Sequence, residues 1–93
     1  MMKTNSITRK FGKLLCLDVT YGDRIESLKI TGDFFLHPEE TLDQIVTELT
    51  GVAVPIQKDV LIRKTRYILD SNEAEMIGIS VDDIINTLEE ATQ

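Results

Sequence analysis

The residue types that most often carry catalysis are sparse in this chain of 93 residues. His37 is the single histidine, so neither a two-histidine metal site nor a Ser-His-Asp relay with a second base can be assembled. The five glycines stand apart from one another, which excludes a glycine-rich phosphate loop. Because it precedes Pro38, His37 is expected to be a turn residue rather than a general base. We therefore expect no catalytic activity from this chain alone.

The remaining candidates for chemistry are one thiol and two pairs of acids. The single cysteine, Cys16, excludes a disulfide within the chain and a cysteine-based zinc site. It falls inside an expected strand with no histidine in the same element, which favours a structural thiol over a nucleophile. Asp82-Asp83 and Glu89-Glu90 fall on an expected helix, where neighbouring side chains point about 100° apart. They are expected to form a solvated face rather than an acid–base pair.

Charge is acidic overall and unevenly distributed. Ten basic against 16 acidic residues give a net charge of −6, which is unfavourable for binding nucleic acid or an anionic membrane. Residues 1–13 carry bases and no acid, whereas residues 67–93 carry acids and no base. Residues 1–11 are expected to be a flexible basic arm, with contact to an acidic neighbour or a phosphate as the alternative. No apolar run approaches the ~20 residues of a membrane helix and no apolar leader is present, so we expect a cytoplasmic protein.

The elements that would position these residues begin with a hairpin. A strand over residues 13–21 has one apolar face, made by Leu15, Leu17, Val19 and Tyr21. Gly22-Asp23 suits a two-residue turn into a second strand over residues 24–31. A bulge near Glu26-Ser27 would bring the apolar residues of this second strand to one face, namely Ile25, Leu28 and Ile30. A short third extended segment or a tight crossing is expected over residues 32–36.

Helices are expected to follow the strands. The first opens at His37-Pro38-Glu39-Glu40, or at a capping box of Thr41 and Gln44, and ends at Gly51. Its expected buried stripe has helical spacing and consists of Leu42, Ile45, Val46 and Leu49.

Two more helices complete the expected order. Residues 57–70 fit a helix or two strands around a basic turn, and the uninterrupted length favours a helix. The last helix begins with a capping box of Ser80 and Asp83. Strands followed by helices predict one α+β domain over residues 12–93, with a small antiparallel sheet covered on one side by about three helices.

Gly32-Asp33-Phe34-Phe35 is the least ordinary segment. A glycine, an acid and two adjacent phenylalanines predict a sharp bend with one ring facing the core and the other facing outward. Core packing alone is the simpler interpretation, and an exposed aromatic anchor for a partner is the alternative. The sequence leaves open which of the two rings is exposed.

These segments together resemble the C-terminal domain of lipoate–protein ligase. The resemblance is carried by Gly12-Lys13-Leu14-Leu15, a Gly22-Asp23 turn, Ile30-Thr31-Gly32-Asp33-Phe34-Phe35 and an acidic helix that ends at Gly51. It covers residues 12–51, and the two later helices agree in order. The chain is expected to be the separately encoded accessory subunit of a two-chain ligase. The resemblance implies a fold related to that of iron–sulfur scaffold and sulfur-acceptor proteins.

The resemblance also implies a division of labour. A catalytic large subunit would bind ATP, Mg and lipoate, form lipoyl-AMP and transfer the lipoyl group to a lysine of an acceptor domain. This chain would bind none of these alone, would form a heterodimer needed for adenylation, and would meet the acceptor indirectly. Closure that excludes water before a mixed anhydride forms is a physical reason for such a subunit. Docking and domain closure would fall to the matching residues, Lys13, Gly32, Asp33, Phe34 and Phe35.

Two other functions remain open from the sequence. An iron–sulfur or sulfur-transfer scaffold would need an exposed, reactive thiol, for which Cys16 is the one candidate. A non-enzymatic interaction module with an unrelated partner is compatible with the acidic C-terminal half.

Overall fold

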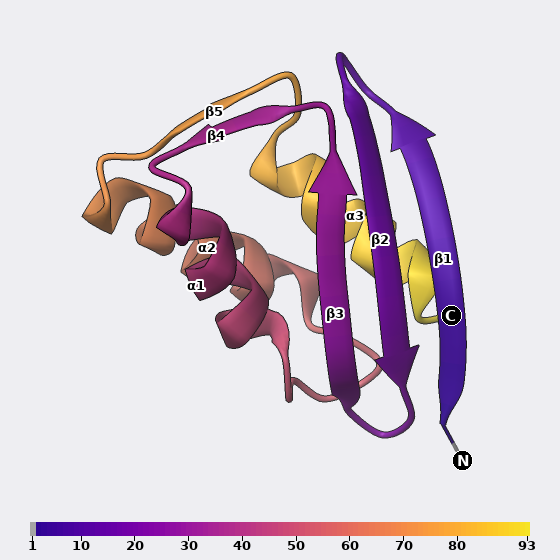
Figure 1. The fold of residues 1–93 in the computed structure, drawn as a ribbon. Coiled ribbons are helices and arrows are strands. Elements are labelled where there is room, and N and C mark those ends of the chain that lie inside the picture. The colour runs from indigo at the N-terminus through magenta and orange to yellow at the C-terminus, as the bar shows by residue number, and fades with distance from the viewer. Residues whose placement is uncertain (1) are drawn as a thin grey trace.

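The computed structural model describes residues 2–93, which form five strands and three helices (Figure 1). In chain order the elements are β1 (Lys3–Lys10), β2 (Leu14–Tyr21), β3 (Ile25–Gly32), β4 (Phe35–His37), α1 (Glu40–Leu49), α2 (Lys58–Ser71), β5 (Glu75–Ile77) and α3 (Val81–Ala91). This arrangement confirms the predicted α+β class.

The predicted hairpin is β2 and β3, the central and one edge strand of a three-stranded antiparallel sheet. The predicted inward face of β2 is buried throughout. Thr20 pairs with Ser27 and Tyr21 with Ile25, which leaves Glu26 as the extra residue of a bulge. The bulge reverses the parity of β3, so that its three apolar residues all face the core, as predicted.

The expectation of a flexible basic arm is not met, because Lys3–Lys10 form the other edge strand, β1, paired along its length with β2. Three contacts hold it besides the ladder. Ile7 packs against the core, the Asn5 side chain donates a hydrogen bond to the Ala91 carbonyl over 3.1 Å, and Arg9 forms an ion pair with Glu90. The basic segment thus lies against the acidic C-terminal helix, which was the alternative to a flexible arm.

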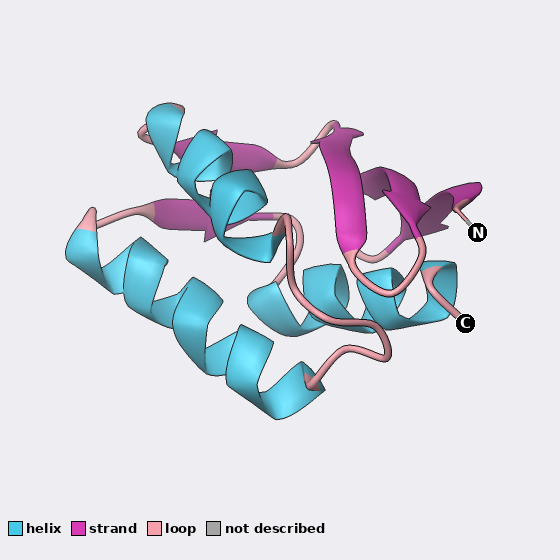
Figure 2. Cartoon of the chain, turned by 90° about the horizontal axis from the view of Figure 1, so that it is seen from below, coloured by secondary structure: helices cyan, strands magenta, loops and turns pink. Residues whose placement is uncertain are grey.

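The molecule has a covered and an open sheet face (Figures 1 and 2). The helix α3 covers one face, and α1 lies beside the edge of β3 and packs on α2, which in turn contacts α3. The core between sheet and helices is aliphatic, with Leu17, Ile25, Ile45, Ile84 and Leu88 almost fully buried. Within residues 2–93, no helix is both long and apolar enough to cross a membrane.

The three helices lie where the sequence predicts them, with local differences at their starts and buried faces. The segment that fitted helix or strand is the helix α2, and Ser80 and Asp83 form the predicted capping box at the start of α3. The helix α1 starts at Glu40 without a side-chain cap, so the alternative box of Thr41 and Gln44 is not formed. Thr41 lies inside the helix and is fully buried together with the expected Ile45 and Leu49, while Leu42 and Val46 are only partly buried.

The second sheet differs most from expectation. The third extended segment is β4, which includes His37, so this residue ends a strand instead of occupying a turn. Its partner is β5, in which Ile77 pairs with Phe35. The strand β5 has three residues, too few for an alternating pattern to be visible in a sequence.

Candidate partner-binding site

All five residues singled out by the sequence lie at one end of the molecule, where the turn between β1 and β2 meets the corner between β3 and β4 (Figure 1). The loop after β5 completes this end. The Gly78 carbonyl accepts hydrogen bonds from the backbone N–H groups of Gly12, over 3.0 Å, and of Lys13, over 2.9 Å. We call this region, formed by residues 11–14, 32–35 and 77–78, the motif end.

Two glycines at the motif end have backbone conformations that favour glycine. Gly32 has a φ of +152° and Gly78 a φ of +98°. A Cβ atom on Gly32 would collide with the Leu14 carbonyl oxygen, and one on Gly78 with the side-chain stem of Lys13. The stem of Lys13 therefore lies directly over Gly78, a contact that the sequence analysis missed because nothing local connects the two positions.

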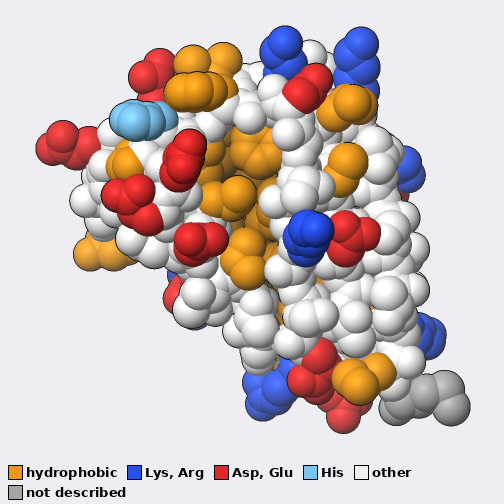
Figure 3. Space-filling model, viewed as in Figure 1, with side chains coloured by type: hydrophobic (Ala, Val, Ile, Leu, Met, Phe, Trp, Pro, Cys, Tyr) orange, Lys and Arg blue, Asp and Glu red, His pale blue; other side chains and the backbone are white. Residues whose placement is uncertain are grey.

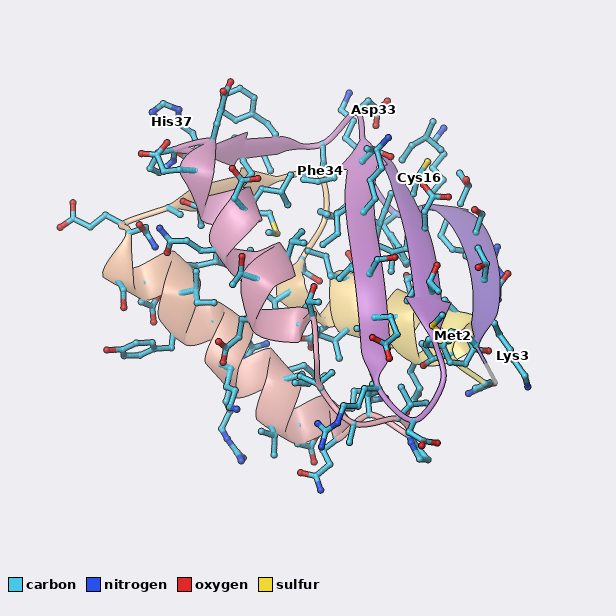
Figure 4. All side chains as sticks on the ribbon, turned by 60° about the horizontal axis from the view of Figure 1, so that its bottom comes forward. Met2, Lys3, Cys16, Asp33, Phe34 and His37 are labelled. Carbon is cyan, nitrogen blue, oxygen red and sulfur yellow. The ribbon has the colours of Figure 1, made fainter. Side chains whose placement is uncertain are left out.

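Asp33 stabilises the corner between β3 and β4 through hydrogen bonds to the backbone of Leu14 (Figure 4). Its Oδ1 accepts a hydrogen bond of 2.6 Å from the Leu14 N–H, and its own N–H donates to the Leu14 carbonyl over 3.3 Å. The carboxylate thus takes the place of a backbone carbonyl and extends the β2–β3 ladder by one step. The structure gives Asp33 a positioning role, while its part in docking stays a prediction.

The adjacent phenylalanines face opposite ways, as the sequence predicted. Phe34 is partly buried and packs against the hydrophobic core. Phe35 is 58% exposed and stacks on His37, with 6.3 Å between ring centroids. Its cross-strand partner Ile77 is 51% exposed. Phe35 is therefore the outward ring, and it lies next to an aliphatic side chain that the sequence did not connect with it.

Exposed apolar side chains gather at the motif end. Among residues 2–93, six large hydrophobic residues are exposed, and four of them belong to this region: Phe11, Leu14, Phe35 and Ile77. Lys13 and Asp33 add one charge of each sign. Exposed aromatic and aliphatic side chains beside polar groups are typical of protein–protein contact surfaces.

The other residues considered for chemistry have structural partners. Cys16 lies on β2 and accepts a hydrogen bond from the Thr8 hydroxyl over 3.3 Å. Asp83 belongs to the capping box, and Asp82 forms an ion pair of 2.8 Å with Arg66. Across residues 2–93, no three His, Cys, Asp or Glu side chains are grouped so as to hold a metal ion.

The fold and the motif end together define a small α+β domain with an exposed apolar surface at one end. One solved structure with a similar chain is that of an archaeal lipoylation system, a bi-partite lipoate protein ligase and its E2 lipoyl domain from Thermoplasma acidophilum. The two chains are 25% identical, with a TM-score of 0.71, over 95% of this chain and 94% of the other. At this coverage the likeness extends well beyond residues 12–51, the segment that carries the motif. No protein-family model matches this chain, and no curated protein matches it significantly.

Proposed function

We propose that this protein is the accessory subunit of a two-chain lipoate–protein ligase, needed by a catalytic large subunit to form lipoyl-AMP from lipoate and ATP. The observation that carries the proposal is the nearly full-length similarity to a chain of a bi-partite lipoate protein ligase system. The sequence resemblance of residues 12–51 to the C-terminal domain of lipoate–protein ligase supports it independently of the overall fold.

The site is better suited to docking than to catalysis. The motif end presents Phe35 and Ile77 to solvent, whereas a catalytic site usually combines a concave pocket with convergent polar groups. Asp33 is engaged with the backbone of Leu14, and the acids of α3 cap the helix or form exposed ion pairs. In this proposal ATP, Mg and lipoate bind to the large subunit, and the lipoyl-acceptor protein meets this chain only through it, in the cytoplasm.

The motif end offers a rigid contact surface for closing the active site of a partner. Asp33 holds the β3–β4 corner through its backbone and carboxylate hydrogen bonds to Leu14, and the Gly78 carbonyl holds the adjoining β1–β2 turn, so Phe35 projects from a fixed frame. A pre-organised apolar surface loses little entropy on binding. Seated over the active site of the large subunit, it would exclude water while a hydrolysable acyl adenylate forms.

Lipoate-dependent exchange of pyrophosphate into ATP tests the proposal, because it reports adenylation before any transfer. We expect the large subunit to exchange slowly or not at all alone, and this chain to show no exchange alone. Mixing the two should restore exchange. Equal exchange by the large subunit with and without this chain would overturn the accessory role.

A mass measurement on the same mixture separates a subunit from a substrate. We expect this chain to keep its mass after incubation with ATP, lipoate and the large subunit, while an added lipoyl-acceptor domain gains one lipoyl group. A lipoyl group on a lysine of this chain would identify it as the acceptor instead.

A further inference from the structure

The strand β3 is an edge strand that is covered over only part of its length. At its start, the Ile25 N–H donates to the Val52 carbonyl over 3.0 Å, and the Ile25 carbonyl accepts from the Gly51 N–H over 2.7 Å. The segment after α1 thereby closes this end of the edge. Further along, the neighbouring segment departs, and α1 stands beside the strand instead of pairing with it (Figure 1).

The backbone groups left open can be identified from the alternation of an antiparallel ladder. The Asp33 N–H donates to the Leu14 carbonyl, so the Leu14–Asp33 pair is a hydrogen-bonded one. Hydrogen-bonded pairs recur at every second residue, so the backbone N–H and C=O groups of Lys29 point toward β2. The backbone N–H and C=O groups of Leu28 and Ile30 therefore point away from β2. No hydrogen bond within residues 2–93 reaches these outward groups of Leu28 and Ile30.

An apolar groove of about 370 Å³ lies against the end of this open edge, at Ile30–Gly32. Ile30 of β3, Phe34 and Leu36 near the corner and Leu42 of α1 line it, with Glu39 at the rim. The space-filling view shows the groove as a hydrophobic hollow between the helix and the sheet (Figure 3). Through Phe34 the groove continues into the motif end, so one partner can contact both.

The helix beside the groove is acidic, and one of its flanking acids lines the groove. From Glu39 to the end of α1 the chain carries four acids and no base, namely Glu39, Glu40, Asp43 and Glu48. Glu39 lines the groove, whereas Asp43 and Glu48 face a hollow toward α2, where Glu48 forms an ion pair with Lys64. A second copy of the chain would bring the same acidic helix and the same net charge of −6 to the groove, and these like charges disfavour pairing of two β3 strands. The opposite sheet edge, β1, differs in carrying the bases Lys3, Arg9 and Lys10.

We propose that a short extended segment of the catalytic large subunit binds in this groove as a fourth strand alongside β3. Its backbone pairs with Leu28 and Ile30, an apolar side chain enters the groove, and a Lys or Arg faces Glu39. Strand addition of this kind combines backbone hydrogen bonds for affinity with a side-chain pocket for specificity. The inference rests on the proposed function and adds the surface and the chemistry of the partner segment.

Amide hydrogen exchange tests the pairing directly. In the free chain, the amides of Leu28 and Ile30 should exchange rapidly, as should that of Thr8, which by the same alternation faces away from β2 on β1. In the complex, Leu28 and Ile30 should slow by about 100-fold or more while Thr8 is unchanged. Protection of Leu28 and Ile30 in the free chain that rises with its concentration would identify a second copy as the occupant and overturn the proposal.

A matched pair of charge reversals tests the partner's chemistry. Glu39→Lys and Glu40→Lys change the net charge equally within one turn, but only Glu39 lines the groove. We expect Glu39→Lys to weaken binding of the large subunit about tenfold at low ionic strength, and Glu40→Lys to change it less than about twofold. Equal effects of the two variants on binding would overturn the inference that a Lys or Arg of the partner faces Glu39.

The outcomes separate this inference from the proposed function. A complex that restores pyrophosphate exchange while Leu28 and Ile30 stay unprotected would overturn strand addition and leave the accessory role intact. A mixture that forms no complex and restores no exchange would overturn both.

Discussion

At the scale of single residues, Phe34 and Phe35 make a natural test pair, because they are identical and adjacent but differ in environment. Phe35→Ala should change the free energy of unfolding by less than about 0.5 kcal/mol, since the ring is mostly in solvent. It should weaken binding of the large subunit about tenfold or more, because exposed aromatic rings at an interface centre are frequent hot spots. Urea unfolding and titration calorimetry measure the two effects.

Phe34→Ala is the matched control. Its ring packs against the core but remains partly exposed, so the loss of stability should be about 2 kcal/mol, less than for a fully buried phenylalanine. Equal and severe unfolding by both replacements would mean that the two rings serve only the core and that Phe35 is not a contact residue.

At the scale of elements, β1 gives the clearest prediction. Removal of residues 2–10 would expose the β2 edge and delete the contacts of Ile7, Asn5 and Arg9. Since a domain of this size is stable by only ~5–10 kcal/mol, we expect the truncated chain to lose cooperative unfolding in urea. A truncated chain as stable as the full one would mean that β1 is dispensable.

Urea unfolding can also separate the contribution of the basic side chains of β1 to stability from the contribution of its backbone pairing. Replacing Lys3, Arg9 and Lys10 by Ser keeps the backbone ladder and removes the ion pair of Arg9, which is an exposed one. We expect this variant to lose less than about 1 kcal/mol, because exposed ion pairs contribute little to stability. The comparison would show that pairing, rather than charge, is the main contribution of β1.

At the scale of the whole molecule, the net charge of −6 predicts opposite effects of salt on the free chain and on the complex. Screening relieves repulsion among the excess acids, so added salt should raise the midpoint of urea unfolding of the free chain. The same screening should weaken binding of a partner that places a Lys or Arg against Glu39. Affinity that does not change with salt would mean that apolar contacts at Phe35 and Ile77 carry the binding alone.

Much of this fold is readable from local patterns. The alternation in β2, the parity break that marks the bulge at Glu26, and the capping box of Ser80 all depend on residues a few positions apart. The bend at Gly32–Phe34 is also encoded locally, although the choice of which phenylalanine faces outward is not. Such features follow from the period of the backbone and from the conformations that glycine and capping residues permit.

Other features were decided by contacts between distant segments. The sequence did not show that residues 3–10 form a strand, because β1 contains few apolar residues and depends on the open edge of β2 and on α3. It did not show β5, whose three residues pair with a distant β4, or the place of Gly78 beneath Lys13.

The sequence by itself thus determined the hairpin, the helices and the motif, whereas only the tertiary structure decided which apolar side chains stay exposed and where they gather. Phe35 is outward because β4 pairs with β5, and the groove exists because α1 stands beside an unpaired stretch of β3. Both depend on pairing and packing between segments far apart in the chain. Such pairing depends on which edges and faces remain free after the local elements have formed, and no short window of sequence contains that information.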